Sequence, residues 1–284
     1  MQAMILGAAG QLGVELSTEL RRRDYRVLAF DRKQLDITSP EAVEAVFSRH
    51  KPALVFNCAA YNFVDLAEKE PEAAMRVNGL AVRLLSMGAQ RVGATFVHYS
   101  TDHVFGGDKG SPYVEEDQPA PPSAYGVSKL AGEYYARAYC ERVYVIRVAG
   151  VFGPAGRHTN RGNFPELVLK KADEGSLLRV VEDFTSTPTY APALAARSID
   201  LTEKAEPGLY HIGGGETISW YRYALKIVEV AHRQAPIEPT DHGEYVTAAR
   251  RPRHSSLSNG KMEAAGLDPM PPLSDALTDY LKRR

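Results

Sequence analysis

The sequence predicts an α/β fold, in which a doubly wound parallel sheet carries a smaller C-terminal lobe over the carboxyl edge of its strands. In the first 150 residues, short apolar runs alternate with longer segments of helical periodicity. This alternation is typical of βαβ units, whose parallel strands are joined by right-handed crossovers. Beyond about residue 150 the elements become shorter and mixed, and no internal repeat or low-complexity tract is found. The 284 residues therefore make one large domain or two modest ones.

Apolar runs predict the strands of the first half, and amphipathic segments predict the helices between them. Strands are expected at residues 3–6, 26–30, 53–56, 95–99 and 143–148. The first helix has Leu12, Leu16 and Leu20 on one face and ends in three arginines, whose cations suit the negative end of the helix dipole. Further helices are expected over 40–50, with Ser39 as the N-cap, and over 71–88 and 125–139.

The second half alternates less regularly. Polar and glycine-containing residues 154–161 predict a loop, and residues 236–253 predict a second loop-rich stretch. Periodicity predicts helices near 164–173, 190–203, 219–233 and 274–284, and strands near 177–181 and at 209–212.

Composition excludes several classes of protein. Lysine plus arginine number 34 and aspartate plus glutamate number 35, so a net charge of −1 argues against a nucleic-acid binder. The two cysteines, Cys58 and Cys140, cannot build a disulfide framework and fit a reducing compartment. No apolar run is long enough for a membrane helix, and the N-terminus lacks the pattern of a signal peptide. We therefore expect a cytoplasmic globular enzyme, or a subunit of one, that binds neither nucleic acid nor membrane.

Three glycines at fixed spacing follow the first predicted strand. Gly7, Gly10 and Gly13 form a G-x-x-G-x-x-G pattern that opens the first helix. In a Rossmann-like sheet such glycines provide a tight turn, let the backbone approach a pyrophosphate, and let helix and strand pack closely. The helix N-terminus adds N–H groups and the positive end of the dipole. The loop, with Gln11 and Leu12, therefore predicts a dinucleotide cofactor, NAD or NADP.

The end of the second strand carries two residues that favour different cofactors. Asp31 is placed to accept hydrogen bonds from the adenosine ribose, which favours NAD. Its neighbour Arg32 is placed to meet a 2′-phosphate, which favours NADP. The sequence leaves this choice open, and Asp31 as a solvated strand end is the structural alternative.

A Y-x-x-x-K pattern begins the helix expected over 125–139. Tyr125 and Lys129 share a helix face, so the phenol and the ammonium can point into one site. A nearby ammonium favours the phenolate and lowers the pKa of the tyrosine, which suits Tyr125 as a general acid toward a developing alkoxide. Thr101 follows a strand at the carboxyl edge of the sheet, where its hydroxyl can hold a substrate carbonyl oxygen.

Together these motifs resemble the dTDP-4-dehydrorhamnose reductase family of the extended short-chain dehydrogenase/reductase superfamily. Beyond the glycine loop, the resemblance is carried nearly end to end by residues 35–38 (LDIT), 57–61 (NCAAY), 64–68 (VDLAE), 77–78 (VN), 98–105 (HYSTDHVF), 125–133 (YGVSKLAGE), 186–189 (STPT), 208–211 (GLYH) and 250–253 (RRPR).

The resemblance implies an NAD(P)H-dependent reduction of the 4-keto group of a nucleotide-linked 6-deoxysugar, with dTDP-4-dehydro-L-rhamnose as substrate and dTDP-L-rhamnose as product. Tyr125 would give the proton, Thr101 would orient the carbonyl, and Lys129 would hold the nicotinamide ribose and tune Tyr125. Further cofactor contacts would come from Asp36, Ile37, Cys58, Ala59, Ala60, Tyr61 and Ser100, and substrate contacts from Asn62, Val64, Thr101, Asp102, His103 and Arg250.

The resemblance also implies a homodimer and, in some members, Mg²⁺ at the dimer contact, where Glu15 would take part. No cluster of His, Cys and carboxylate residues has the spacing of a zinc site.

Some positions depart from the family pattern and face the substrate. His103 replaces a tyrosine, Gly150 stands where a tryptophan of the sugar pocket is usual, and Phe184 begins a Phe-Thr-Ser run in place of Gln-x-Gly. A related reductase or epimerase of another nucleotide sugar therefore stays an alternative. A non-catalytic subunit that binds NADP and stabilises a partner enzyme is the alternative from a different class.

For several candidate residues the alternative is a purely structural role. His103 would then only form hydrogen bonds within the protein, the arginines at 250–253 would belong to a solvated loop, and Cys58 would be a small core residue. Trp220, with its neighbours Tyr221 and Tyr223, is expected in the core. We expect residues 1–150 to form the NAD(P)-binding Rossmann-like domain, with a segment near 185–212 returning to it, and residues 151–284 to form mainly the substrate-binding lobe.

Overall fold

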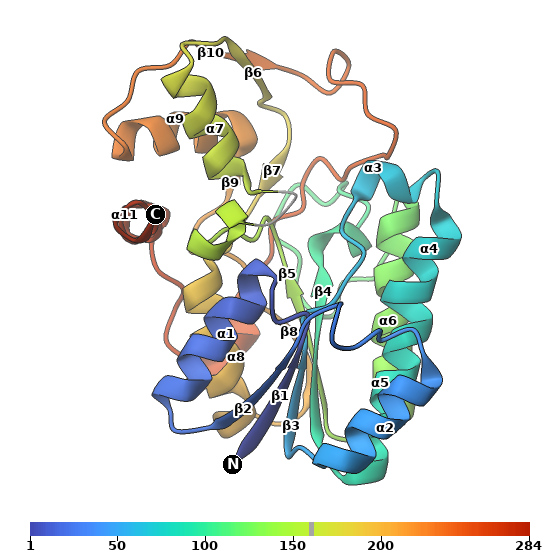
Figure 1. Ribbon diagram of the computed structural model, residues 1–284. Coiled ribbons are helices and arrows are strands. Elements are labelled where there is room, and N and C mark those ends of the chain that lie inside the picture. Colours follow the sequence, from blue (N-terminus) through green and yellow to red (C-terminus); the bar gives the residue numbers. More distant parts are fainter. Residues whose placement is uncertain (159–161) are drawn as a thin grey trace.

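A six-stranded parallel sheet is the centre of the computed structural model, which describes residues 1–158 and 162–284 (Figure 1). The strand order is β2-β1-β3-β4-β5-β8. The chain steps from β1 to one edge and from β3 to the other, so the predicted doubly wound α/β fold is confirmed. The last strand pairs with β5, which returns a late segment of the chain to the sheet. The strands are β1 (Gln2–Leu6), β2 (Arg26–Phe30), β3 (Leu54–Asn57), β4 (Thr95–Thr101), β5 (Val143–Val148) and β8 (Gly208–His211).

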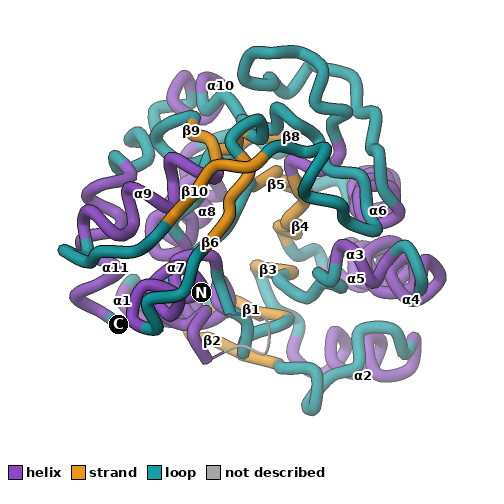
Figure 2. The backbone as a smooth tube through the Cα atoms, turned by 90° about the horizontal axis from the view of Figure 1, so that it is seen from above, coloured by secondary structure: helices purple, strands orange, loops and turns teal. Residues whose placement is uncertain are grey.

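Helices cover both faces of this sheet, as Figure 2 shows from above. One face carries α1 (Gln11–Arg22) and α8 (Ala191–Lys204), which contact each other. The other face carries α2 (Pro40–His50), α5 (Ala81–Val92) and α6 (Ala124–Tyr139). The predicted N-cap of α2 is confirmed, because the Ser39 hydroxyl accepts a hydrogen bond from the Ala42 N–H.

β1 illustrates how the sequence builds these layers. Successive side chains of a strand point to opposite faces. Ala3 and Ile5 therefore join the core beneath α1 and α8, whereas Met4 and Leu6 join the core beneath α2, α5 and α6. All four are buried, and a fully buried Ile, Leu or Met contributes roughly 1.5–3 kcal/mol. The sheet is held from both sides, so the ends of its strands form a fixed edge.

The helix expected over 71–88 is longer and less regular than predicted. It runs as α4 (Pro71–Met75), a π-helical turn (Arg76–Leu80) and α5, which ends at Val92 because Gly93 adopts a left-handed φ of 68°. Gly88 does not end the helix; it packs against the ring of Phe47. Helix α6 comes close at the π turn, where a Cβ on Gly132 would lie 2.2 Å from the Asn78 carbonyl oxygen.

The C-terminal lobe lies above the carboxyl edge of the sheet (Figure 1). Its apolar core is formed by α7 (Phe164–Asp173), α9 (Trp220–Val230) and α11 (Leu273–Arg283), together with the parallel pair β6 (Leu178–Val181) and β10 (Ile237–Thr240). The strand β10 corrects the prediction of a loop-rich stretch over 236–253. Glu238 and Pro239 interrupt its apolar pattern, and the strand forms because β6 offers a free edge for pairing.

Several short elements were not predicted, because they are shorter than one period of a recognisable pattern. They are α3 (Val64–Ala67), a 3₁₀ turn at Asp102–Val104, α10 (Gly260–Ala264) and the antiparallel ribbon of β7 (Thr185–Ser186) and β9 (Ile218–Ser219). The loop predicted over 154–161 holds a 3₁₀ helix at Pro154–His158, and residues 159–161 lie outside the described part. Among the described residues, no helix combines the length and hydrophobicity needed to cross a membrane. The division into two domains at residue 150 stays a prediction.

Candidate active site

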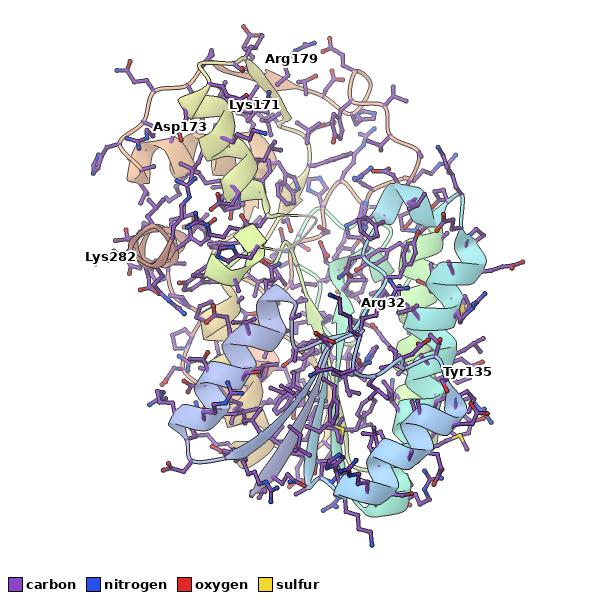
Figure 3. All side chains as sticks on the ribbon, viewed as in Figure 1. Arg32, Tyr135, Lys171, Asp173, Arg179 and Lys282 are labelled. Atoms are coloured by element: carbon purple, nitrogen blue, oxygen red, sulfur yellow. The ribbon has the colours of Figure 1, made fainter. Side chains whose placement is uncertain are left out.

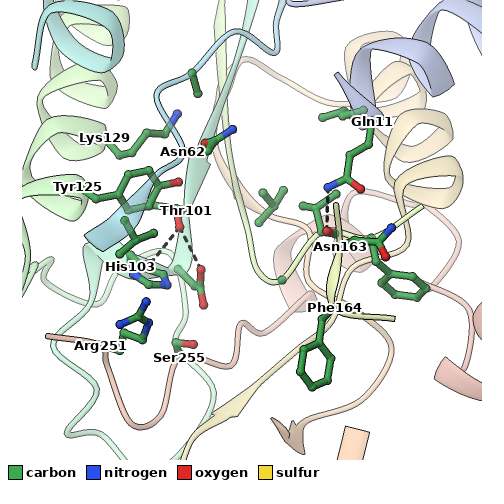
Figure 4. Close-up of a pocket in the computed structure, with 18 of the residues that line it drawn as sticks. Gln11, Asn62, Thr101, His103, Tyr125, Lys129, Asn163, Phe164, Arg251 and Ser255 are labelled. Carbon is green, nitrogen blue, oxygen red and sulfur yellow. Dashed lines mark hydrogen bonds between the residues drawn. The ribbon is translucent and has the colours of Figure 1, made fainter. Parts of the chain in front are cut away.

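A cavity of about 690 Å³ opens between the carboxyl edge of the sheet and the lobe. Its floor is formed by the segments that follow β1, β3, β4 and β5, and its far wall by residues of α7, β6 and the start of α9. Figure 4 shows Thr101, Tyr125 and Lys129 on one side of this cavity and Gln11, Asn163 and Phe164 on the other. In doubly wound sheets ligands bind at this edge, so the fold itself places the site.

The glycine loop lies at the edge of the cavity and has the backbone shape that a phosphate cradle needs. Gly7 turns with φ 75°, and a Cβ on Gly13 would lie 2.5 Å from the Gly7 carbonyl oxygen, so only glycine fits at either position. Gly10 caps α1 without a side-chain hydrogen bond, which leaves the first N–H groups of the helix facing the cavity. The Gln11 amide donates to the Val151 carbonyl and ties the loop to the lobe. This cradle fits a pyrophosphate.

The residues expected at the adenosine end lie beyond the cavity lining, at the end of β2. One oxygen of Asp31 accepts the N–H groups of Lys33 and Gln34, while Arg32 is exposed and lies near the upper edge of the sheet (Figure 3). Asp36 accepts two hydrogen bonds from Thr38, which lower the pKa of its carboxyl. Ile37 is buried.

The turn after β3 reaches the cavity with its first three residues. Cys58, Ala59 and Ala60 line it, whereas Tyr61 is outside the lining. The Asn78 side chain fixes this turn by accepting from the Tyr61 N–H and donating to the Tyr61 carbonyl. Burial raises the pKa of the Cys58 thiol, so it stays protonated and serves as a packing residue.

Tyr125 and Lys129 both enter the cavity from the first turns of α6, as the i, i+4 spacing predicted. The edge of the Tyr125 ring meets the His103 ring with centroids 5.6 Å apart. The ammonium of Lys129 donates to the Tyr99 carbonyl oxygen at 2.5 Å. Burial lowers the pKa of Lys129 to about 8, against the opposite influence of the Glu133 carboxylate. Lys129 is therefore a desolvated cation beside a phenol.

Thr101 ends β4 and opens the 3₁₀ turn that follows. Its hydroxyl donates to Asp102 at 3.0 Å and accepts the His103 N–H at 3.1 Å (Figure 4). Ser100, the residue before it, donates to Glu133 at 2.5 Å. The cavity thus holds a hydroxyl, a phenol and an ammonium within one wall, the set that a carbonyl reduction requires.

The residues expected to contact the substrate are brought together, with one exception. Asn62, Val64, Asp102 and His103 line the cavity near Thr101. Arg250 is exposed and lies outside the lining, whereas Arg251 lines the cavity. The Arg251 guanidinium forms two hydrogen bonds to the Asp65 carboxylate, at 3.1 and 2.6 Å.

The lobe wall of the cavity was largely missed by sequence reasoning. Trp220 was expected in the core, but it also lines the cavity, where its ring meets the Phe164 ring edge-on at 4.9 Å. Phe184 and Gly150, which depart from the family pattern, line it as well. Gly150 lies against Trp220, since a Cβ there would be 3.5 Å from the indole. These two departures were the sequence signals for this wall, whose residues come from separate segments without a shared motif.

No group of His, Cys, Asp and Glu suited to hold a metal ion is found within residues 1–158 and 162–284. Glu15, which the family resemblance connected with Mg²⁺, is buried and accepts a hydrogen bond from Arg283 at 2.8 Å. The described residues thus give no support to a metal site.

Known proteins resemble the chain along its whole length. Residues 1–284 match the family model described as the RmlD substrate binding domain. The chain is 36% identical to the spore coat polysaccharide biosynthesis protein SpsK of Bacillus subtilis (strain 168), over 100% of this chain and 98% of the relative. It is 37% identical to a dTDP-4-dehydrorhamnose reductase of Streptomyces griseus, over 97% and 91%. A crystal structure of dTDP-4-dehydrorhamnose reductase from Bacillus anthracis str. Ames in complex with NADP covers 100% of this chain and 99% of that one, with a TM-score of 0.94 and 32% identity.

Proposed function

Because the chain belongs to the family described as the RmlD substrate binding domain, we propose that it uses NADPH to reduce the 4-keto group of a dTDP-linked 6-deoxysugar, with dTDP-4-dehydro-L-rhamnose as substrate. Family membership makes it an NAD(P)H-dependent oxidoreductase. The observation that carries the proposal is that Thr101, Tyr125 and Lys129 line the same cavity as the phosphate cradle.

Tyr125 is the proposed general acid. Its hydroxyl gives a proton to the carbonyl oxygen while hydride, which bound NADPH supplies, reaches the carbonyl carbon, so the ketone becomes a secondary alcohol. Lys129 holds the nicotinamide ribose, and its positive charge stabilises the phenolate that Tyr125 becomes when it donates its proton. The Thr101 hydroxyl has one hydrogen to donate, and in this structure it donates a hydrogen bond to Asp102. The hydroxyl must therefore rotate away from Asp102 before it can donate to the substrate carbonyl.

The adenosine end supports NADPH over NADH. One Asp31 oxygen is engaged by two backbone N–H groups, and Arg32 and Lys33 are exposed beside it, where they can pair with a 2′-phosphate. The Arg32→Ala variant is expected to raise the KM for NADPH at least about tenfold and leave the KM for NADH nearly unchanged. Equal losses with both cofactors would contradict this assignment.

The diphosphate of the substrate is assigned to Arg251. Its guanidinium lines the cavity and already holds a carboxylate in a forked arrangement, which is also the geometry for phosphate. The lobe wall with Phe164, Phe184 and Trp220 then receives the apolar parts of the sugar nucleotide.

The test is purified protein with dTDP-4-dehydro-L-rhamnose and NADPH, followed by cofactor oxidation and by product identification. UDP-linked and other dTDP-linked 4-keto sugars form the comparison panel. We expect oxidation of one NADPH per dTDP-L-rhamnose formed, with slower reduction of the other sugars. No turnover of any dTDP-linked 4-keto sugar with either cofactor would refute the proposal.

A further inference from the structure

A buried carboxylate lies one helical turn beyond Lys129. Glu133 is 3% exposed and occupies the i+4 position of α6, so it shares the helix face of Lys129. One of its oxygens accepts from the Ser100 hydroxyl at 2.5 Å and from Arg147 Nε at 2.9 Å. The other accepts from Arg147 Nη2 at 2.7 Å. A single carboxylate therefore connects α6 to β4 and β5 directly behind the cavity.

Three titratable groups close to Lys129 are uncharged at pH 7. Burial raises the pKa of Cys58, which follows β3, and of Tyr99 on β4, so both stay protonated. Burial, together with the charge of Lys129, lowers the pKa of His98 on β4, so its ring is uncharged. Asp102 lies at the substrate end of the cavity, bonded to Thr101. The carboxylate whose charge favours the Lys129 ammonium is that of Glu133.

The counterion of this carboxylate is held on the side of β5. The Arg147 guanidinium lies over the Phe105 ring, with 4.9 Å between Cζ and the ring centroid. Its Nη1 lies 3.5 Å from Nε2 of His211. The opposite ring nitrogen of His211 lies 3.1 Å from the Tyr113 carbonyl, to which it donates as Nδ1–H, so Nε2 is left as an acceptor. Arg147 of β5 is thus held by Phe105, which follows the 3₁₀ turn after β4, and by His211 of β8, and it pairs with Glu133 of the helix that carries Lys129.

We propose that Glu133 is a positioning residue of the catalytic centre. Through one oxygen it fixes Ser100, and with it the backbone that carries Thr101. Through its charge it keeps the buried Lys129 side chain an ammonium. This inference rests on the roles proposed above for Thr101 and Lys129. The alternative is that Glu133 forms a purely structural ion pair, in which only its contact with Arg147 matters.

A cycle of variants distinguishes these two roles. Glu133→Gln removes the charge but leaves Arg147 buried without its partner, which can destabilise the fold severely. The double variant Glu133→Gln/Arg147→Met removes both charges together and relieves that penalty. Ser100→Ala keeps the charge of Glu133 and removes its hydrogen bond to Ser100, so the pH at which NADPH binding falls, rather than the affinity itself, is the matched control for positioning.

Two pH profiles are measured for each variant: the affinity for NADPH by fluorescence, and kcat for the proposed substrate. In the unaltered protein both are expected to fall above about pH 8, where Lys129 loses its proton. In the double variant this fall moves at least about one pH unit lower, although the melting temperature recovers. In Ser100→Ala the fall stays near pH 8, while kcat drops about tenfold.

The proposal is overturned if the double variant regains both the melting temperature and the unaltered pH profile of NADPH binding, as a structural ion pair would. It is also overturned if NADPH binding by the unaltered protein has no fall near pH 8. If the binding profiles move as expected but no 4-keto sugar is turned over, the inference about Glu133 and Lys129 stands and the proposed reaction fails.

Discussion

Replacing Gly13 by alanine should damage cofactor binding more than it damages stability. The added Cβ would lie 2.5 Å from the Gly7 oxygen and 2.7 Å from Ala8 Cα, about 1 Å inside normal contact. Both opposing atoms belong to the backbone, so the phosphate loop itself must move. Overpacking of this kind costs ~1–3 kcal/mol, and alanine returns ~1 kcal/mol of helix propensity within α1. The net loss of about 0–2 kcal/mol lowers the melting temperature by at most about 4 °C, because unfolding of a chain of this length carries a large entropy change.

The displaced loop is the part of the chain that faces the pyrophosphate, so the Kd for NADPH should rise at least about tenfold. Gly88→Ala is the matched control. It is also a helical glycine, and its Cβ would lie 2.8 Å from the Phe47 ring, far from the cofactor loop. It should lower the melting temperature by a similar amount and leave the NADPH affinity unchanged. The reasoning is refuted if Gly13→Ala binds NADPH within twofold of the unaltered protein, as measured by calorimetry.

Other variants test the remaining roles. Tyr125→Phe should lower kcat by roughly 10²–10⁴-fold with an unchanged Kd for NADPH, and full activity would exclude Tyr125 as the acid. Arg251→Met should raise the KM for the nucleotide sugar at least about tenfold, whereas Arg250→Met, at an exposed position outside the cavity, should have little effect; equal effects would disprove the assignment of the diphosphate to Arg251. Lys129→Met should abolish activity but stabilise the protein at pH 7 by about 2 kcal/mol. The pKa of Lys129 is near 8 in the folded protein and 10.5 in the unfolded chain, a difference that corresponds to ~3 kcal/mol of destabilisation by the buried ammonium. The lost hydrogen bond to the Tyr99 carbonyl subtracts ~1 kcal/mol from the gain. Below pH 8 the folded state bears the whole cost of burying the ammonium, and between pH 8 and 10.5 that cost disappears, so the stability gained by the variant should shrink as the pH rises. Denaturant unfolding at pH 7 and pH 10 measures this change. A variant that is less stable than the unaltered protein at pH 7 would contradict the reasoning.

The fold was predictable where local patterns are long. The helix at Phe164–Asp173 and the strand at Val143–Val148 have the predicted bounds, because each has a full period of apolar residues. The helix after Pro71 was predicted to end at Gly88, but in the structure it continues to Val92. In the structure Gly88 makes room for the Phe47 ring, a contact that no local pattern contains. The strand β10 was missed for a similar reason, since it exists through its pairing with β6.

The candidate site divides in the same way. The loop at Gly7–Gly13 and the pair of Tyr125 and Lys129 have fixed spacing within one element, so the sequence alone could place them. The contact of Trp220 with Gly150 joins residues from different segments and was not predictable from either. Whether Arg250 or Arg251 can contact the substrate depends on which of the two neighbouring side chains faces the cavity. The hydrogen bond from Arg251 to Asp65 of α3 holds the Arg251 side chain there.

The sequence by itself determined the glycine loop, the pairing of Tyr125 with Lys129 on one helix face and the alternation of strands and helices that gives a parallel sheet, because each depends on spacing or pattern along the chain. Only the tertiary structure decided what stands behind and opposite those side chains. The charge on Lys129 depends on burial and on a carboxylate fixed by Ser100 and Arg147, and the lobe wall depends on the packing of α7 and α9. Desolvation and side-chain packing act between residues that are distant in the chain, so they become visible only when the chain is folded.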